Sequence, residues 1–205
     1  MGLTAERLKA SLDALAGIEP AIAAALARIG YPEPRIRSRG FETLLRAIVS
    51  QQVSIKAAAA ILAKVDAATG GIGDPANVAA ASDEALRAAG LSRQKIGYLR
   101  SLAEDVLSAR LDFAALPEDD EAAIAALTHV KGIGRWTAEV YLLFAEGRAD
   151  IFPAGDLAVQ IEVGRILGLP ERPGEKQVRA LAEPWRPHRG AAAIFAWHHR
   201  HVVPV

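Results

Sequence analysis

The sequence predicts an all-α protein. Alanine and leucine are frequent, and apolar residues recur at spacings of three and four, which places them on one face of a helix. No segment alternates apolar and polar residues with a period of two, and the Asn-Gly dipeptide that closes many β-hairpins is missing. We therefore expect roughly ten helices at the usual length of ~11–12 residues.

The expected helices have physical starts and stops. Thr4 can cap a first helix, which Gly17 can end. Ser82 can cap a short helix that Gly90 ends. Apolar stripes predict further helices over residues 41–51, 55–65, 94–109, 121–128, 137–145 and 157–167.

Composition excludes several classes of site. The chain has 205 residues and no cysteine, so it can form no disulfide, no Cys-ligated zinc site and no Cys-ligated iron–sulfur cluster. No apolar run reaches the ~18–20 residues that span a bilayer, and the first residues do not form the apolar stretch of a signal peptide. We expect no membrane partner and a cytoplasmic location.

Charge is balanced overall but unevenly distributed. Lys and Arg number 24, and Asp and Glu also number 24. A net charge of zero argues against a polyanionic partner. However, residues 35–56, 93–100, 131–135 and 186–189 are locally basic. Each group alone is typical of a solvated helix surface, whereas four groups on connectors between helices favour phosphate contacts.

A glycine turn joins two apolar helical segments. Lys131 and Arg135 flank the turn Gly132-Ile133-Gly134. Glycine allows a tight turn with positive φ, and the exposed backbone N–H groups could hold a phosphate while Ile133 anchors the turn in the core. The alternative is a plain turn between helices in which glycine only caps the first helix.

A carboxylate begins the next predicted helix. Asp156 lies at the N-cap position of the segment 157–167. Asp is among the most favoured N-cap residues and needs no further role there. A capped and oriented carboxylate can also stabilise a developing cation or orient a water molecule. The two roles are compatible.

Four passages, in this order, resemble the helix-hairpin-helix DNA glycosylase superfamily, in particular its alkylpurine branch of 3-methyladenine DNA glycosylase II-like proteins. The passages correspond to the helix before the DNA-wedging loop, the hairpin, the catalytic-Asp loop and a C-terminal Pro-Trp-Arg-Pro segment. They are Phe41–Ser54, Val130–Ala138, Phe152–Asp156 and Pro184–Arg189.

The resemblance implies two helical subdomains with an active-site cleft between them. We expect a central domain over residues 41–149 that carries the helix-hairpin-helix at about 127–146. Residues 1–40 together with 150–205 would form the second domain, which carries the catalytic Asp loop.

The resemblance also implies a monofunctional DNA glycosylase of base excision repair. Such an enzyme flips alkylated purines of the 3-methyladenine type out of double-stranded DNA and hydrolyses the N-glycosidic bond. Bifunctional members carry a lysine that forms a Schiff base, where this sequence has Trp136, so no lyase step is expected. The implied enzyme is a monomer that needs no cofactor. Na⁺ or K⁺ at the hairpin carbonyls of Val130 and Gly132 is a further implication.

Individual roles follow from the same resemblance. Asp156 is the expected catalytic residue, and Gln52 is the expected wedge. Because aromatic faces attract cationic bases, we expect a substrate pocket with walls from the aromatic residues, although buried tryptophans equally often only fill a core. The pocket candidates are Trp136, Trp197 and Tyr141, and the DNA-binding candidates are Gln51, Gln52, Lys131, Gly132, Ile133, Gly134, Arg135 and Arg186.

Two alternative functions stay open. The chain could be a non-catalytic helix-hairpin-helix module that binds DNA, or a glycosylase for deaminated or oxidised bases. The spacing of His198, His199 and His201 is poor for a metal site, so we interpret these residues as a polar terminus.

Overall fold

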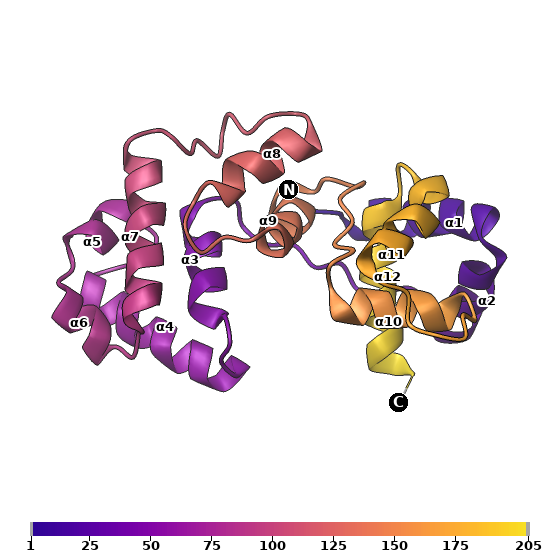
Figure 1. Ribbon diagram of the computed structural model, residues 1–205, viewed down its shortest axis with the longest axis horizontal. Helices are drawn as coiled ribbons and strands as arrows, with labels where there is room; N and C mark the ends of the chain where they lie inside the picture. Colours follow the sequence, from indigo (N-terminus) through magenta and orange to yellow (C-terminus); the bar gives the residue numbers. More distant parts are fainter. Residues whose placement is uncertain (1, 204–205) are drawn as a thin grey trace. The chain divides into compact units, whose positions relative to one another are not determined.

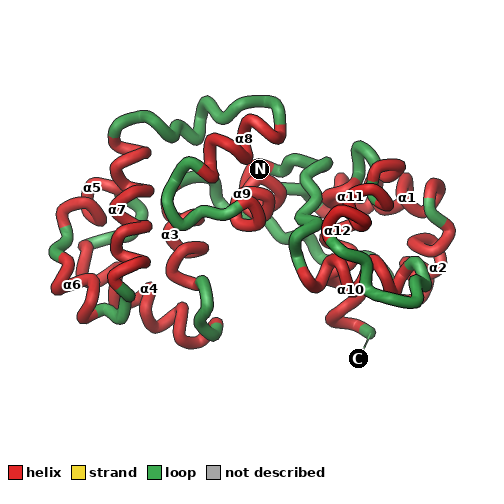
Figure 2. Tube along the Cα trace, viewed as in Figure 1, coloured by secondary structure: helices red, strands yellow, loops and turns green. Residues whose placement is uncertain are grey.

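The computed structural model describes residues 2–203, and its regular structure in that range is helical throughout (Figures 1 and 2). This confirms the all-α prediction. The α-helices are α1 (Ala5–Ile18), α2 (Pro20–Ile29), α3 (Phe41–Ser50), α4 (Ile55–Thr69), α5 (Pro75–Ala80), α6 (Asp83–Ala88), α7 (Arg93–Leu107), α8 (Asp120–Thr128), α9 (Arg135–Tyr141), α10 (Leu157–Ile166), α11 (Glu175–Leu181) and α12 (Arg189–Val202). A π-helical segment, η1 (Leu142–Glu146), follows α9, and a 3₁₀ turn, η2 (Glu183–Trp185), precedes α12.

The chain divides into two compact units. One unit is Ser38–Tyr141, and the other joins Met1–Arg37 to Leu142–Val205. The sequence placed the second boundary at 149/150, eight residues later than the 141/142 boundary of the structure. We call the unit that joins Met1–Arg37 to Leu142–Val205 the terminal unit. Residues 142–149 belong to it because the Phe144 carbonyl accepts the Arg37 amide at 2.9 Å and the Ala149 carbonyl accepts the Gly190 amide at 2.8 Å. The expected cleft between the units stays a prediction.

Within the unit Ser38–Tyr141, the long helix α7 packs against α3 and α5 (Figure 1). The predicted apolar stripe of α3 faces the core, since Leu44, Leu45 and Ile48 have no exposed surface. From α7, Leu99 and Leu102 are equally buried. Burying such side chains contributes about 1.5–3 kcal/mol each.

The terminal unit is built from the two ends of the sequence. Figure 1 shows α1 and α2, in indigo, beside the orange and yellow helices α10 to α12. Leu8, Leu12 and Leu15 of α1 and Phe195 of α12 are almost completely buried. This core supports the start of α10, where Asp156 lies.

Capping residues set several helix starts as predicted. The Thr4 hydroxyl accepts the Arg7 amide at 3.3 Å, and the Ser82 hydroxyl accepts the Ala85 amide at 3.1 Å. The prediction that Gly17 ends the first helix was wrong, because α1 continues to Ile18 and the chain turns at Glu19 instead. Among residues 2–203, no helix is both long enough and apolar enough to cross a membrane.

Candidate nucleic-acid interface and active site

The predicted hairpin is present as α8, a short turn and α9. Val130 and Ile133 are only 1% and 4% exposed, and the Ile133 amide donates to the Val130 carbonyl at 3.1 Å. Ile133 therefore anchors the turn in the core, as predicted. Lys131 and Gly134 lie on the exposed side of the same turn.

The two hairpin glycines serve different purposes. Gly132 has a φ of 88°, and a Cβ atom there would lie 2.3 Å from the Tyr98 ring. Both its backbone conformation and its packing therefore require glycine. Gly134 does not share the positive φ, and a Cβ atom there would meet nothing within 4 Å. Among residues 2–203, nothing requires a glycine at this position.

Two backbone amides of the turn lack an acceptor among the described residues. Within residues 2–203, the amides of Gly132 and Gly134 donate to no other group. Unpaired backbone N–H groups beside an exposed glycine are suited to hydrogen bonds with an anion such as a phosphate. Phosphate binding at this turn, as opposed to a turn that only caps a helix, stays a prediction.

The loop after α3 contacts the hairpin. The side-chain amide of Gln51 donates to the Gly132 carbonyl at 2.9 Å. The next residue, Gln52, is exposed and adopts a left-handed backbone conformation with a φ of 57°. The structure thus brings the predicted wedge loop and the predicted hairpin together in one unit.

Arg135 forms ion pairs within the hairpin. Its guanidinium donates two hydrogen bonds to Glu121 of α8, and its Nε donates to the buried carboxylate of Glu139 at 2.9 Å. The hydrogen bonds that Arg135 donates to Glu121, followed by the charge of Glu139, raise the pKa of Arg135. Arg135 therefore links α8 to α9, and the two carboxylates largely neutralise its positive charge.

Asp156 caps α10, and two hydrogen bonds orient its carboxylate. Its Oδ1 accepts the Val159 amide at 2.9 Å and the indole Nε1–H of Trp197 at 3.2 Å. The side chain is partly exposed at the start of the helix. The cap role is confirmed, and the indole bond adds an orientation that capping does not require.

Aromatic and amide side chains support this carboxylate. The Phe144 ring lies 5.6 Å from the Trp197 ring, centroid to centroid. The buried side chain of Gln160 donates to the Ala154 carbonyl at 2.8 Å and so fixes the loop before Asp156. Neither Phe144 nor Gln160 could be predicted from the sequence, because both contacts depend on tertiary packing.

The other pocket candidates lie in the unit Ser38–Tyr141. Trp136 is 48% exposed in the first turn of α9. Tyr141 is only 3% exposed, its hydroxyl accepts the Gly40 amide at 2.8 Å, and its ring lies 5.8 Å from Phe113. The packing of Tyr141 gives it a structural role in the core of this unit.

Arg186 is paired with acids in the terminal unit. Its Nε donates to Glu183 at 2.6 Å, and its guanidinium also contacts Asp150, which in addition binds Arg189 at 2.8 Å. The hydrogen bond with Glu183, followed by the charge of Asp150, raises the pKa of Arg186. Half of the side chain stays exposed.

His199 differs from the polar terminus that the sequence suggested. It is 3% exposed, and its Nδ1 lies 2.8 Å from the fully buried Glu162 carboxylate. Because the guanidinium of Arg28, 3.2 Å from Nε2, can only donate, Nε2 accepts and Nδ1 donates to Glu162. This pair ties α12 to α10 and was not visible in the sequence, where the two residues are 37 positions apart.

A protein-family model matches residues 45–187. It describes the HhH-GPD superfamily of base excision DNA repair proteins. The match covers the loop after α3, the hairpin, the Asp156 loop and the segment with Arg186.

Several characterised proteins are similar to the chain. DNA-3-methyladenine glycosylase 1 of Schizosaccharomyces pombe is 36% identical over 161 residues, which cover 77% of this chain and 71% of that protein. DNA-3-methyladenine glycosylase 2 of Escherichia coli is 32% identical over 188 residues, which cover 85% of this chain and 64% of that protein. A structure of the S. pombe 3-methyladenine DNA glycosylase in complex with abasic DNA superposes with a TM-score of 0.82 at 31% identity, over 94% of this chain and 97% of that one. The chain belongs to the HhH-GPD superfamily of base excision DNA repair proteins.

Proposed function

We propose that this protein is a monofunctional DNA glycosylase that excises alkylated purines of the 3-methyladenine type from double-stranded DNA. The observation that carries the proposal is the carboxylate of Asp156, which the Val159 amide and the Trp197 indole orient at the start of α10. Relatives named DNA-3-methyladenine glycosylases support the choice of substrate.

Asp156 acts on the sugar. Cleavage of the N-glycosidic bond gives the sugar oxocarbenium character, and a nearby carboxylate stabilises that positive charge. The same carboxylate can orient the attacking water. An alkylated purine is already cationic and leaves readily, so the reaction requires no strong general acid.

Aromatic side chains would hold the flipped base. Trp197 lies beside Asp156, and its ring can attract a cationic base with about 0.5–2 kcal/mol. Trp136 is the second candidate because nearly half of its surface is exposed. Tyr141 is not part of this proposal, since its ring and hydroxyl are occupied within the core.

The hairpin and the Gln51–Gln52 loop would hold the DNA. The amides of Gly132 and Gly134 bind a backbone phosphate, and the open space at Gly134 allows the close approach. Flipping the nucleotide out of the duplex costs a few kcal/mol. Gln52 fills the gap that the flipped nucleotide leaves. Arg135 and Arg186 contribute less than the sequence suggested because acids neutralise both.

The absence of a lyase step belongs to the same proposal. The side chain of Trp136 has no amine that could form a Schiff base. We expect that borohydride, added during incubation with abasic DNA, traps no covalent protein–DNA complex. A trapped complex would overturn the monofunctional assignment.

A monomer with no resident cofactor is proposed, together with Na⁺ or K⁺ at the carbonyls of Val130 and Gly132. Each oxygen already accepts one hydrogen bond, from the Ile133 amide and from the Gln51 side chain, and each has a second lone pair. The test compares the affinity for DNA in potassium, sodium and choline chloride at equal ionic strength.

Chromatography of the bases released from methylated genomic DNA tests the function directly. We expect free 3-methyladenine, alone or with other alkylated purines. Release of only deaminated or oxidised bases would assign a different glycosylase. Binding of DNA with no release of any base would assign a non-catalytic module.

A further inference from the structure

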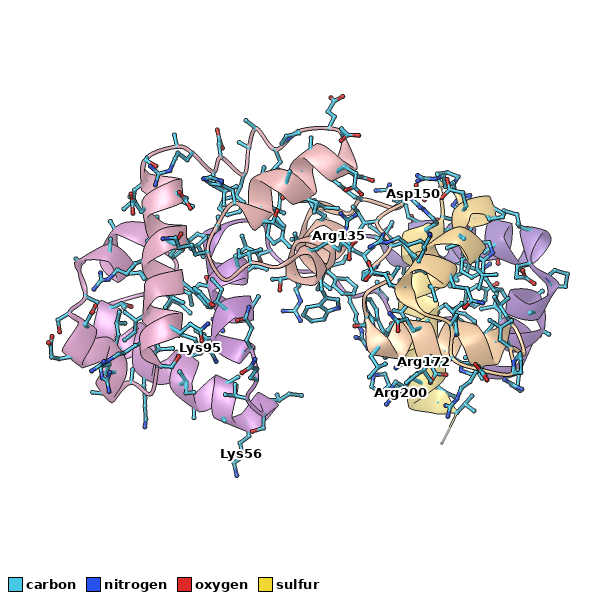
Figure 3. All side chains as sticks on the ribbon, viewed as in Figure 1. Lys56, Lys95, Arg135, Asp150, Arg172 and Arg200 are labelled. Carbon is cyan, nitrogen blue, oxygen red and sulfur yellow. The ribbon has the colours of Figure 1, made fainter. Side chains whose placement is uncertain are left out.

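Lys95 of α7 donates hydrogen bonds to the end of α3. Its Nζ lies 2.7 Å from the Val49 carbonyl and 2.7 Å from the Gln51 carbonyl. The last carbonyls of a helix have no partner within the helix, and a cation is favourable there. In Figure 3, the labelled Lys95 side chain lies between α7 and α3. Partial burial lowers the pKa of its ammonium group.

The segment that Lys95 holds continues into a strained residue. Gln52 has a φ of 57°, a left-handed conformation that is strained for a residue with a Cβ atom. Such a conformation persists only where the surroundings fix it. Lys95 fixes the carbonyl immediately before Gln52, and Ser54, which accepts the Ala57 amide at 3.2 Å, fixes the chain after it.

The same face of α7 also holds the hairpin. The Tyr98 ring packs against Gly132, and the Ser101 hydroxyl accepts the Lys131 amide at 3.3 Å. Lys95, Tyr98 and Ser101 are spaced by three residues, which places them along one side of the helix. Helix α7 therefore contacts both the turn that carries Gln52 and the hairpin turn Gly132-Ile133-Gly134, and it sets the distance between them.

We propose that Lys95 is a positioning residue, which acts through the Val49 and Gln51 carbonyls to hold Gln52 in the orientation that fills the gap in the DNA. The inference rests on the proposed function, because it assigns the gap-filling role to Gln52. Lys95 itself need not touch DNA in this account. Loss of its two hydrogen bonds frees the turn, so that Gln52 relaxes from its left-handed conformation.

The test compares two duplexes that differ only in an abasic-site analogue. The measured quantity is the ratio of the affinities for the abasic and the intact duplex, and 2-aminopurine opposite the site reports how the gap is filled. The variants are Lys95→Met, Lys95→Arg, Gln52→Ala and the double variant Lys95→Met with Gln52→Ala. Lys176→Met, an exposed position on α11, is the matched control for loss of one lysine charge.

We expect Lys95→Met to lower the affinity ratio about 10-fold or more, as for loss of a hydrogen bond from a charged donor, with unchanged affinity for the intact duplex. Lys95→Arg should retain most of the ratio because it keeps the donors. The double variant should be no worse than Gln52→Ala alone, since one residue acts through the other. The 2-aminopurine signal of Lys95→Met should match that of Gln52→Ala.

Three results would overturn the proposal. Additive losses in the double variant would show that Lys95 acts independently of Gln52. Equal losses for both duplexes, with a salt slope reduced by about one, would make Lys95 a phosphate contact. An unchanged ratio in Lys95→Met would leave the turn independent of Lys95. These readouts need no base release, so a wild-type protein that releases no base would overturn the proposed function and still test Lys95.

Discussion

The indole of Trp197 donates a hydrogen bond to the same carboxylate oxygen of Asp156 that caps α10. The bond joins α12 to the start of α10 across 41 positions of sequence. A donor aimed at this oxygen limits the rotation of the carboxylate, so under the proposed function the group that stabilises a developing cation is oriented before the substrate arrives.

Trp197→Phe should lower the rate of base release while leaving the fold intact. Phenylalanine keeps an aromatic ring beside Phe144 but removes the donor to Asp156. Loss of one hydrogen bond to a charged group costs about 1.5–3 kcal/mol, or roughly a 10- to 100-fold lower rate under single-turnover conditions. Circular dichroism melting provides the control for folding. A wild-type rate in this variant would remove Trp197 from the site.

Alanine substitutions should separate the two hairpin glycines. Gly132→Ala should destabilise the protein, because its Cβ atom would clash with Tyr98 and its φ is positive. Gly134→Ala should fold as the wild type does and yet bind DNA several-fold more weakly, since its methyl group would occupy the space that a phosphate approaches. Thermal melting and affinity for a short duplex measure the two effects.

Wild-type DNA affinity for Gly134→Ala would contradict phosphate binding at this turn. Equal loss of thermal stability in the two variants would show that Gly134 is structural as well.

DNA binding should depend only modestly on salt. In the unit Ser38–Tyr141, several of the basic side chains that the sequence singled out are neutralised by acids, as Arg46 is by Glu42. Of the basic residues that the sequence singled out within this unit, Lys56, Arg93 and Lys131 are exposed and pair with no acid among residues 2–203. Figure 3 shows Lys56 extending away from α4. Three phosphate contacts correspond to a slope of log affinity against log salt of about −3.

Titrations at four or more salt concentrations measure that slope. A slope near −9, as for about ten phosphate contacts, would contradict the account.

Local patterns predicted the local parts of this structure. The apolar stripe of α3, the Thr4 and Ser82 caps and the buried Ile133 all follow from residues within one or two helical turns of each other. Long-range pairs left no such trace, because Lys95 and the Gln51 carbonyl, or His199 and Glu162, meet only after the helices pack. For the same reason, the basic groups along the sequence overstated the positive charge, since Arg135 is neutralised by Glu121 from the preceding helix.

The most direct test of the central claim is single-turnover base release by Asp156→Asn. Asparagine caps a helix as well as aspartate does and is nearly isosteric, so the fold should be kept. It cannot stabilise a cation with a negative charge. We predict a rate at least ~100-fold below that of the wild type, with affinity for abasic DNA within about 3-fold. Turnover at the wild-type rate would contradict the assignment of Asp156 as the catalytic carboxylate.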